Sequence, residues 1–198
     1  MKKKIAFFDF DGTITTKDSF VEFLRFTQGS SSLYLGFLRN AAYLVAYKLK
    51  LIPNQKAKEK VLEYFFGQSC ATDFDELCKK FSEAVLPQLI RPKAVEEIKT
   101  LQQKGFNVVV VSASPENWIR PWTDRMGVSL IASCLETING TVTGKLNGKN
   151  CRGEEKVRRI LELHRMDEYD EIYAYGDTSG DKPMMKLATK SFYKPFRK

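Results

Sequence analysis

Two carboxylates stand one residue apart at the end of an apolar run in residues 5–13, IAFFDFDGT. Successive side chains of an extended chain alternate between two faces, so we expect Asp9 and Asp11 to point the same way. Like charges at this spacing repel and raise each other's pKa unless a positive group lies between them. The stretch itself contains no basic residue. We therefore expect a divalent cation or a reaction intermediate to supply the counter-charge.

Further polar residues follow other apolar or helical segments. They are Ser112, then Lys156, then Asp177 and Asp181. Taken singly, each has an ordinary explanation as a helix cap, a turn residue or a solvated lysine. Ligands of open α/β sheets bind where the parallel strands end, and helix N-termini favour anions. The order of all these groups along the chain therefore predicts one functional site at that edge of a sheet.

Apolar runs alternate with helical patterns through the second half of the chain. The predicted strands are residues 4–10, 106–111, 128–133 and 171–176, with a β-hairpin at 135–149. The predicted helices are residues 92–104, a segment opened by Ser114-Pro115 and ending near Met126, and residues 153–165 and 182–188. This alternation is typical of a doubly wound parallel sheet, so we predict an α/β fold with a Rossmann-like three-layer core.

Residues 16–90 do not follow this alternation, because they contain helical patterns and no convincing strand. We expect residues 1–15 and 91–198 to form the catalytic core and residues 16–90 to form a helical cap inserted after the first strand. Within the cap, residues 33–52 are the most apolar segment, but Arg39, Lys48 and Lys50 argue against a membrane span. The segment is either a helix packed on its neighbours or an interfacial helix on a membrane surface.

The net charge of the 198-residue chain is +8, and no acidic residue lies between Glu22 and Glu59. Such a basic stretch favours anionic partners, for example phosphorylated metabolites or lipid headgroups, or is simply a solvated face. No nucleic-acid-binding motif accompanies it. The four cysteines show no C-x-x-C pair, which predicts reduced thiols in a cytosolic protein. One histidine cannot build a histidine-phosphatase site, and no cysteine has the downstream arginine of a cysteine phosphatase.

The motifs D-F-D-G-T, strand-end Ser, Lys and G-D-x-x-x-D, in this order, resemble those of the haloacid dehalogenase superfamily. The resemblance implies that Asp9 is a nucleophile that forms an aspartyl-phosphate. It implies that Asp11 is the general acid for the leaving group and then the general base for water. Lys156 would neutralise charge on the nucleophile and the phosphate.

The same resemblance implies the ligands of the phosphate and of a metal. The phosphoryl oxygens would be bound by the Ser112 hydroxyl, the Ala113 N–H and Lys156. The Mg²⁺ ligands would be Asp9, the carbonyl of Asp11, and Asp177, with Asp181 completing the site directly or through a neighbouring ligand. The expected activity is a Mg²⁺-dependent phosphomonoester phosphatase.

A helical insert at this position resembles the phosphoserine-phosphatase-like branch of the superfamily. The long, apolar and basic cap is also similar to bacterial phosphatidylglycerolphosphate phosphatases of that branch. The expected substrate is a small phosphorylated metabolite or a phosphorylated lipid headgroup. The alternatives are a phosphotransferase or mutase with the same intermediate, or a non-catalytic protein on a membrane surface. We expect a cytoplasmic location, with peripheral contact to the inner face of an anionic membrane as a further alternative.

Overall fold

A parallel sheet forms the centre of the protein in a computed structural model that describes residues 3–197. The terminal residues 1–2 and 198 of the predicted core lie outside the described residues. Within them, the five strands of this sheet are ordered β4-β3-β1-β7-β8, and every neighbouring pair is parallel. The strands are β1 (Lys3–Phe8), β3 (Phe106–Pro115), β4 (Ser129–Ser133), β7 (Tyr169–Gly176) and β8 (Lys190–Tyr193).

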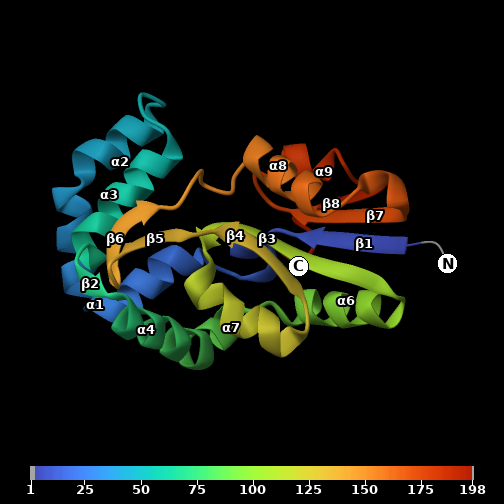
Figure 1. Cartoon of the computed structure of the whole chain (residues 1–198), viewed down its shortest axis with the longest axis horizontal. Coiled ribbons are helices and arrows are strands. Elements are labelled where there is room, and N and C mark those ends of the chain that lie inside the picture. Colours follow the sequence, from blue (N-terminus) through green and yellow to red (C-terminus); the bar gives the residue numbers. More distant parts are fainter. Residues whose placement is uncertain (1–2, 198) are drawn as a thin grey trace.

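Helices cover both faces of the sheet, as Figure 1 shows. Ala6 and Phe8 of β1 belong to the same buried cluster as residues of α6 (Pro92–Gln103) and α7 (Glu116–Met126). Ile5 and Phe7 point to the other face, in a cluster with residues of α8 (Glu154–Leu163) and α9 (Lys182–Met185). This alternation with period two gives an apolar strand that is buried on both faces. The predicted three-layer α/β fold is thus confirmed.

Several predicted boundaries of strands and helices are wrong. The first strand ends at Phe8 rather than residue 10, because the chain turns tightly through Phe10–Ile14. Strand β3, predicted as residues 106–111, extends to Pro115, so the following helix begins at Glu116 and Ser114 is not its cap. The N–H of Ser114 instead donates to the Ser112 hydroxyl. The last helix stops at Met185, three residues before the predicted end.

Residues 16–90 are mainly helical, as predicted. They form α1 (Ser19–Arg39), α2 (Ala41–Lys48), α3 (Asn54–Phe66), α4 (Ala71–Ala84) and α5 (Leu86–Leu89). The apolar segment 33–52 is not one helix, because the chain breaks at Asn40, whose amide donates to the carbonyl of Gly36 at 2.9 Å. No helix among residues 3–197 combines the length and apolar character needed to cross a bilayer.

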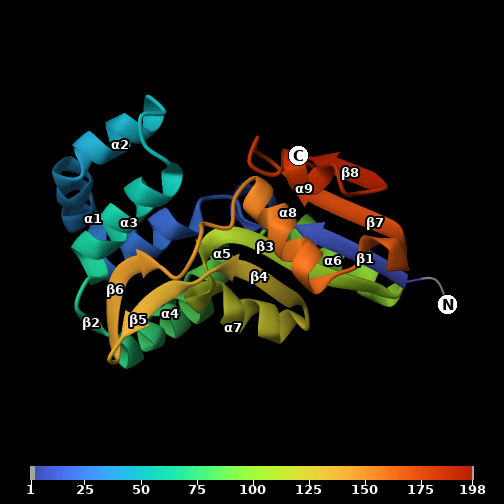
Figure 2. The same ribbon diagram turned by 45° about the horizontal axis from the view of Figure 1, so that its top comes forward.

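The expectation that residues 16–90 contain no strand is wrong. Ser69–Cys70 form a short strand, β2, that pairs antiparallel with β6 (Thr141–Leu146). β6 also pairs with β5 (Leu135–Ile138), which confirms the predicted hairpin. The hairpin therefore lies beside α3 in the insert, although it comes from the second half of the chain (Figure 2). Gly144 allows this approach, because a side chain there would clash with the backbone of Glu63.

An aromatic cluster joins the insert to the core. The ring of Phe23 stacks on Trp118 of α7 at a centroid distance of 4.6 Å and contacts Phe66 and Phe81 within the insert. The indole N–H of Trp118 donates to the Ser19 hydroxyl at 3.1 Å. Phe81, Trp118 and Trp122 are all buried. These contacts hold the start of α1 close to the ends of β1 and β3, where the polar motifs lie.

Candidate active site

Asp9 follows the central strand β1 and is anchored by its backbone, since its N–H donates to the carbonyl of Tyr175 at 2.9 Å. Its side chain is 10 % exposed and accepts hydrogen bonds from Lys156 at 2.6 Å and from the Thr13 hydroxyl at 3.0 Å. Burial raises the pKa of Asp9 to about 7, and the ammonium of Lys156 opposes this shift only in part. A further positive charge would therefore stabilise the ionised carboxylate.

Asp11 lies two residues further on, in the turn that follows β1. One carboxylate oxygen accepts from the backbone N–H of Ser19 at 2.6 Å, and the other accepts from the Ser114 hydroxyl at 2.7 Å. These two donors fix the side chain between the start of α1 and the end of β3. Asp9 and Asp11 both line the same cavity. This placement agrees with the expectation from the sequence that both side chains point to the same side of the chain.

Lys156 links two of the predicted motifs. It projects from the first turn of α8, is 1 % exposed, and donates to Asp9 at 2.6 Å, Asp181 at 2.8 Å and the carbonyl of Val111 at 2.7 Å. Burial disfavours its charge, but the two carboxylates outweigh burial and raise the pKa of Lys156. The lysine is therefore held as a cation at the ends of the parallel strands.

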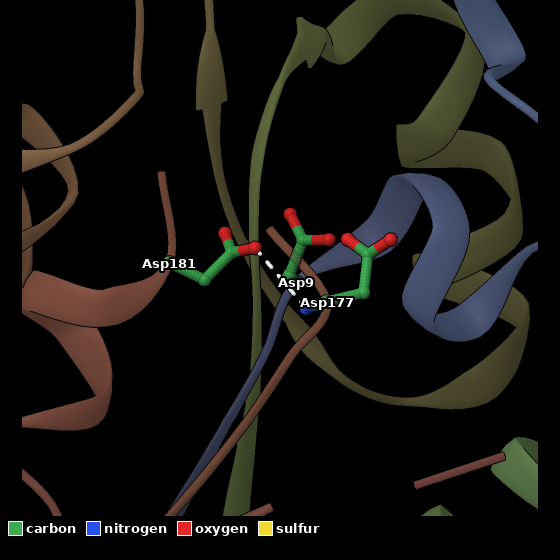
Figure 3. Close-up of side chains that lie close together, drawn as sticks. All are labelled: Asp9, Asp177 and Asp181. Atoms are coloured by element: carbon green, nitrogen blue, oxygen red, sulfur yellow. Dashed lines mark hydrogen bonds between the residues drawn. The ribbon is translucent and has the colours of Figure 1, made fainter. Parts of the chain in front are cut away.

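Asp177 and Asp181 follow β7 and converge on Asp9, as Figure 3 shows. Each of the three buried residues offers a carboxylate oxygen, and these oxygens lie within 4.8 Å of one another. The second oxygen of Asp181 accepts from the N–H groups of Asp177 and Thr178 and from the Thr178 hydroxyl. Burial alone would raise the pKa of Asp181, but Lys156 and the Thr178 donors outweigh it and lower that pKa.

The donor set fits a hard divalent cation. Among residues 3–197, the Oδ1 atom of Asp177 is buried and has no hydrogen-bond partner, whereas its Oδ2 accepts from Arg197. A buried carboxylate oxygen without a partner is costly unless a ligand satisfies it. Mg²⁺ prefers oxygen ligands of this kind. The cluster of Asp9, Asp177 and Asp181 can therefore hold the predicted metal, while the side chain of Asp11 is engaged elsewhere.

Ser112 and Ala113 lie near the end of β3. Ser112 is fully buried, and its hydroxyl accepts the N–H of Ser114 at 3.0 Å. Ala113 lines the cavity beside Asp11, and its carbonyl accepts from Lys58 at 2.8 Å and from Ser133 at 2.8 Å. The structure thus brings this segment to the carboxylates, and Ala113 and Ser114, rather than Ser112, reach the cavity surface.

A cavity of about 590 Å³ extends from the carboxylates into the insert. Its far walls are largely apolar and come from α1, α2 and α3, including Phe20, Phe37, Leu44 and Val61. The insert therefore forms most of the space that a substrate's leaving group would occupy.

Sequence reasoning did not assign a role to several polar residues that line the cavity, among them Asp18, Lys58 and Arg152. Asp18 caps α1 by accepting from the N–H of Val21, and partial desolvation at the cavity together with the carboxylate of Asp11 raises its pKa. Burial lowers the pKa of Lys58, against the carboxylates of Asp18 and Asp11. The Asp-Ser pair before an apolar run is a capping signal that could have marked Asp18. Nothing local marks Lys58, whose position depends on how the insert folds.

The profile of the haloacid dehalogenase-like hydrolase family matches residues 6–186 of the chain. The chain belongs to this family. Protein CicA of Caulobacter vibrioides is 36 % identical over 194 residues, which cover 96 % of this chain and 85 % of CicA.

Two solved structures show the same fold. A protein of unknown function from Bordetella pertussis Tohama I has a TM-score of 0.83 at 22 % identity, covering 96 % of this chain and 89 % of that one. A substrate-bound phosphoserine phosphatase has a TM-score of 0.70 at 18 % identity, covering 98 % and 86 %. The expected likeness to the phosphoserine-phosphatase-like branch is thus confirmed for the fold, and family and fold together support phosphatase activity.

Proposed function

We propose that this haloacid dehalogenase-like hydrolase is a Mg²⁺-dependent phosphomonoesterase that works through an aspartyl-phosphate. The observation that carries the proposal is the position of Lys156, which bonds to Asp9 and Asp181 at once at the closed end of the cavity. A buried cation between two carboxylates can accommodate a phosphate dianion that the carboxylates alone would repel.

In the first step, a carboxylate oxygen of Asp9 forms a bond to phosphorus while the bond to the leaving oxygen breaks. Asp11, held by Ser19 and Ser114, donates a proton to the leaving alkoxide. In the second step, Asp11 takes a proton from water as the water oxygen attacks phosphorus and Asp9 is released. Each step transfers one phosphoryl group, and the proton returns to Asp11.

The remaining groups would bind the phosphate and the metal. We assign the phosphoryl oxygens to Lys156 and the backbone N–H of Ala113. The predicted Ser112 hydroxyl is fully buried and accepts the N–H of Ser114, so we give it the role of holding this segment in place. The metal ligands would be Asp9, the carbonyl of Asp11, Asp177 and Asp181. Bound Mg²⁺ would supply positive charge that stabilises the transferring phosphoryl group.

The cavity supports a substrate whose leaving group has an apolar part, because the insert lines it with Phe20, Phe37 and Leu44. Both a small phosphorylated metabolite and a phosphorylated lipid headgroup meet this requirement. The tip of the insert also exposes apolar side chains, with Leu38, Leu49 and Leu51 exposed by 72 %, 64 % and 73 %. These side chains lie within the acid-free basic segment between Glu22 and Glu59, and together they favour peripheral contact with an anionic membrane.

The test is Mg²⁺-dependent phosphate release from a paired panel of substrates. Phosphatidylglycerolphosphate in mixed micelles is compared with soluble monoesters that include phosphoserine. A higher kcat/KM for the lipid would identify an interfacial substrate, and a higher value for a soluble ester would make the apolar cap an ordinary lid. Absence of turnover with every ester would contradict the proposed activity. A requirement for a phosphorylated activator would instead point to a mutase.

A further inference from the structure

The last described residues of the chain, 194–197, lie against the end of β7 next to the carboxylate cluster. The N–H of Lys194 donates to the carbonyl of Gly176 at 2.8 Å. The ring of Phe196 stacks on Tyr175 at a centroid distance of 5.7 Å, and Arg91 donates to the carbonyl of Phe196 at 3.2 Å. These contacts fix the tail on the core, so the side chain that follows them has a defined position.

That side chain is Arg197, whose guanidinium forms an ion pair with Oδ2 of Asp177. Asp177 is almost completely buried, and Arg197 is partly exposed, with 42 % of its side chain accessible. The backbone of Gly12 borders the same carboxylate, since a side chain at Gly12 would clash with Asp177. The carboxylate of Asp177 is therefore confined between the turn after β1 and the C-terminal tail.

Two cations, Lys156 and Arg197, form the ion pairs of the three clustered carboxylates. Lys156 bonds to Asp9 and Asp181, and the bonds found for it among residues 3–197 do not include Asp177. Arg197 supplies the positive partner of the third carboxylate. Its bond occupies Oδ2 and leaves the buried Oδ1 without a partner in the described part of the chain. Groups that hold a metal ligand in this way orient it and commonly strengthen metal binding.

We infer that Arg197 is a positioning residue that holds Asp177 for binding of the divalent cation. The inference rests on the proposed function, since it takes Asp177 as a metal ligand. A guanidinium suits this role because its planar fork sets the orientation of a carboxylate, which the point charge of lysine does less well. Arg197 touches neither substrate nor reacting atoms in this scheme and acts through Asp177.

The test is the affinity for Mg²⁺, measured by isothermal titration calorimetry on the full chain without substrate. We expect Arg197→Gln to weaken Mg²⁺ binding by about tenfold, as second-sphere changes do elsewhere. Arg197→Lys should restore part of the affinity. Lys194→Gln removes the same charge from the same tail, where the ammonium lies 4.9 Å from the ring of Tyr193, and should bind Mg²⁺ as the unaltered chain does.

A kinetic readout separates positioning from general damage. The Mg²⁺ concentration for half-maximal activity of Arg197→Gln should rise by the same factor, while kcat at saturating Mg²⁺ stays within about twofold of the unaltered enzyme. Unchanged or tighter Mg²⁺ binding in Arg197→Gln would overturn the inference, and tighter binding would identify Arg197 as a competing cation.

Asp177→Asn in the same titration distinguishes failure of this inference from failure of the proposed metal site. If Asp177→Asn abolishes Mg²⁺ binding and Arg197→Gln does not weaken it, the role of Arg197 alone is wrong. If Asp177→Asn binds Mg²⁺ as well as the unaltered chain, the assigned metal ligands are wrong and the role of Arg197 is wrong with them.

Discussion

The ammonium of Lys58, on helix α3 of the insert, donates a hydrogen bond of 2.8 Å to the carbonyl oxygen of Ala113, at the end of core strand β3. It also lies 3.4 Å from the side-chain oxygen of Asn150, and 5.6 Å from the ring centroid of Phe20. One cation of the insert thus reaches the core segment to which we assign phosphate binding. This contact joins the insert directly to the edge of the site.

Replacement of Lys58 by methionine should weaken substrate binding more than chemistry. We expect KM to rise about tenfold with a smaller change in kcat, because a charged hydrogen bond at the cavity is lost. The melting temperature should not fall, since burial lowers the pKa of Lys58 and its charge is costly to bury. Lys56→Met, at an exposed position of the same helix, is the control. Equal effects of both variants on KM would show that only overall charge matters.

Asp9→Asn should abolish turnover and leave the fold intact. The expected loss is on the order of 10⁴-fold or more, because an amide cannot attack phosphorus. Phosphate release gives the activity, and circular dichroism with thermal unfolding reports the fold. Near-normal phosphate release by a folded Asp9→Asn protein would remove Asp9 from the mechanism.

Asp11→Asn should lower kcat by roughly 10²–10⁴-fold, the range typical of a lost general acid–base group. A substrate with a good leaving group, such as 4-nitrophenyl phosphate, needs no proton in the first step. Aspartyl-phosphate formation from this substrate should therefore survive better than its hydrolysis, and a burst of 4-nitrophenolate should appear in rapid-mixing experiments. Equal loss of burst and steady-state rates would argue against the two-step role of Asp11.

Glu155 should stabilise the folded chain at neutral pH and lose this effect in acid. Hydrogen bonds from Arg158 and Arg159 lower its pKa from 4.5 to about 2. A carboxyl group with a lowered folded pKa stabilises above its unfolded pKa, and the stabilisation disappears as pH falls from about 4.5 towards 2. Glu155→Gln should reduce the free energy of unfolding by about 1–2 kcal/mol at pH 7, since Arg158 is partly solvent-screened.

Urea unfolding at pH 7 and pH 3.5 measures this difference. The difference in the free energy of unfolding between Glu155→Gln and the unaltered chain should be smaller at pH 3.5 than at pH 7. Glu154→Gln, one residue earlier at an exposed position, controls for charge at the start of α8. If this difference in unfolding free energy does not depend on pH, the effect of Glu155 comes from packing rather than from its ionisation.

Vesicles that contain anionic lipid should recruit the protein through residues 33–52. Leu49→Ser combined with Leu51→Ser should reduce sedimentation with these vesicles, because both side chains are exposed at the tip of the insert. Leu161→Ser, which alters an exposed leucine of α8, should have no effect. Equal sedimentation with neutral and anionic vesicles at low salt would contradict the electrostatic part of the prediction.

The fold of the core could be predicted because each of its buried strands is marked by a short sequence pattern of its own. Each buried strand is a short apolar run, and two of the polar motifs follow one directly, as Asp9 follows β1 and Asp177 follows β7. Parallel pairing then brings strand ends together whatever their separation in sequence. The role of Lys156 beside Asp9 came instead from the family resemblance, because Lys156 lies in the first turn of α8 and follows no strand of the parallel sheet.

The insert was less predictable because tertiary contacts decide its details. The two-residue strand β2 exists only through its pairing with β6, about 70 residues away in the sequence. No short-range sequence pattern predicts this strand. Lys58 reaches Ala113 only after α3 is placed over the strand ends. Arg197 lies in a tail without regular structure, so its ion pair with Asp177 could not be read from spacing.

The chain leaves the core and returns to it twice, once for the insert and once for the β5–β6 hairpin. At each place the outgoing and returning segments are hydrogen-bonded to each other. Thr16 donates to the carbonyl of Leu89 at 2.7 Å, and Asn147 donates to the carbonyl of Cys134 at 2.9 Å. These two connections define a single axis. We therefore expect the insert and the hairpin to rotate together about this axis relative to the core, rather than to move independently. A chimaera that exchanges residues 16–90 alone would leave β6 without its β2 partner. Transplanting substrate preference between relatives therefore requires moving both segments as one unit.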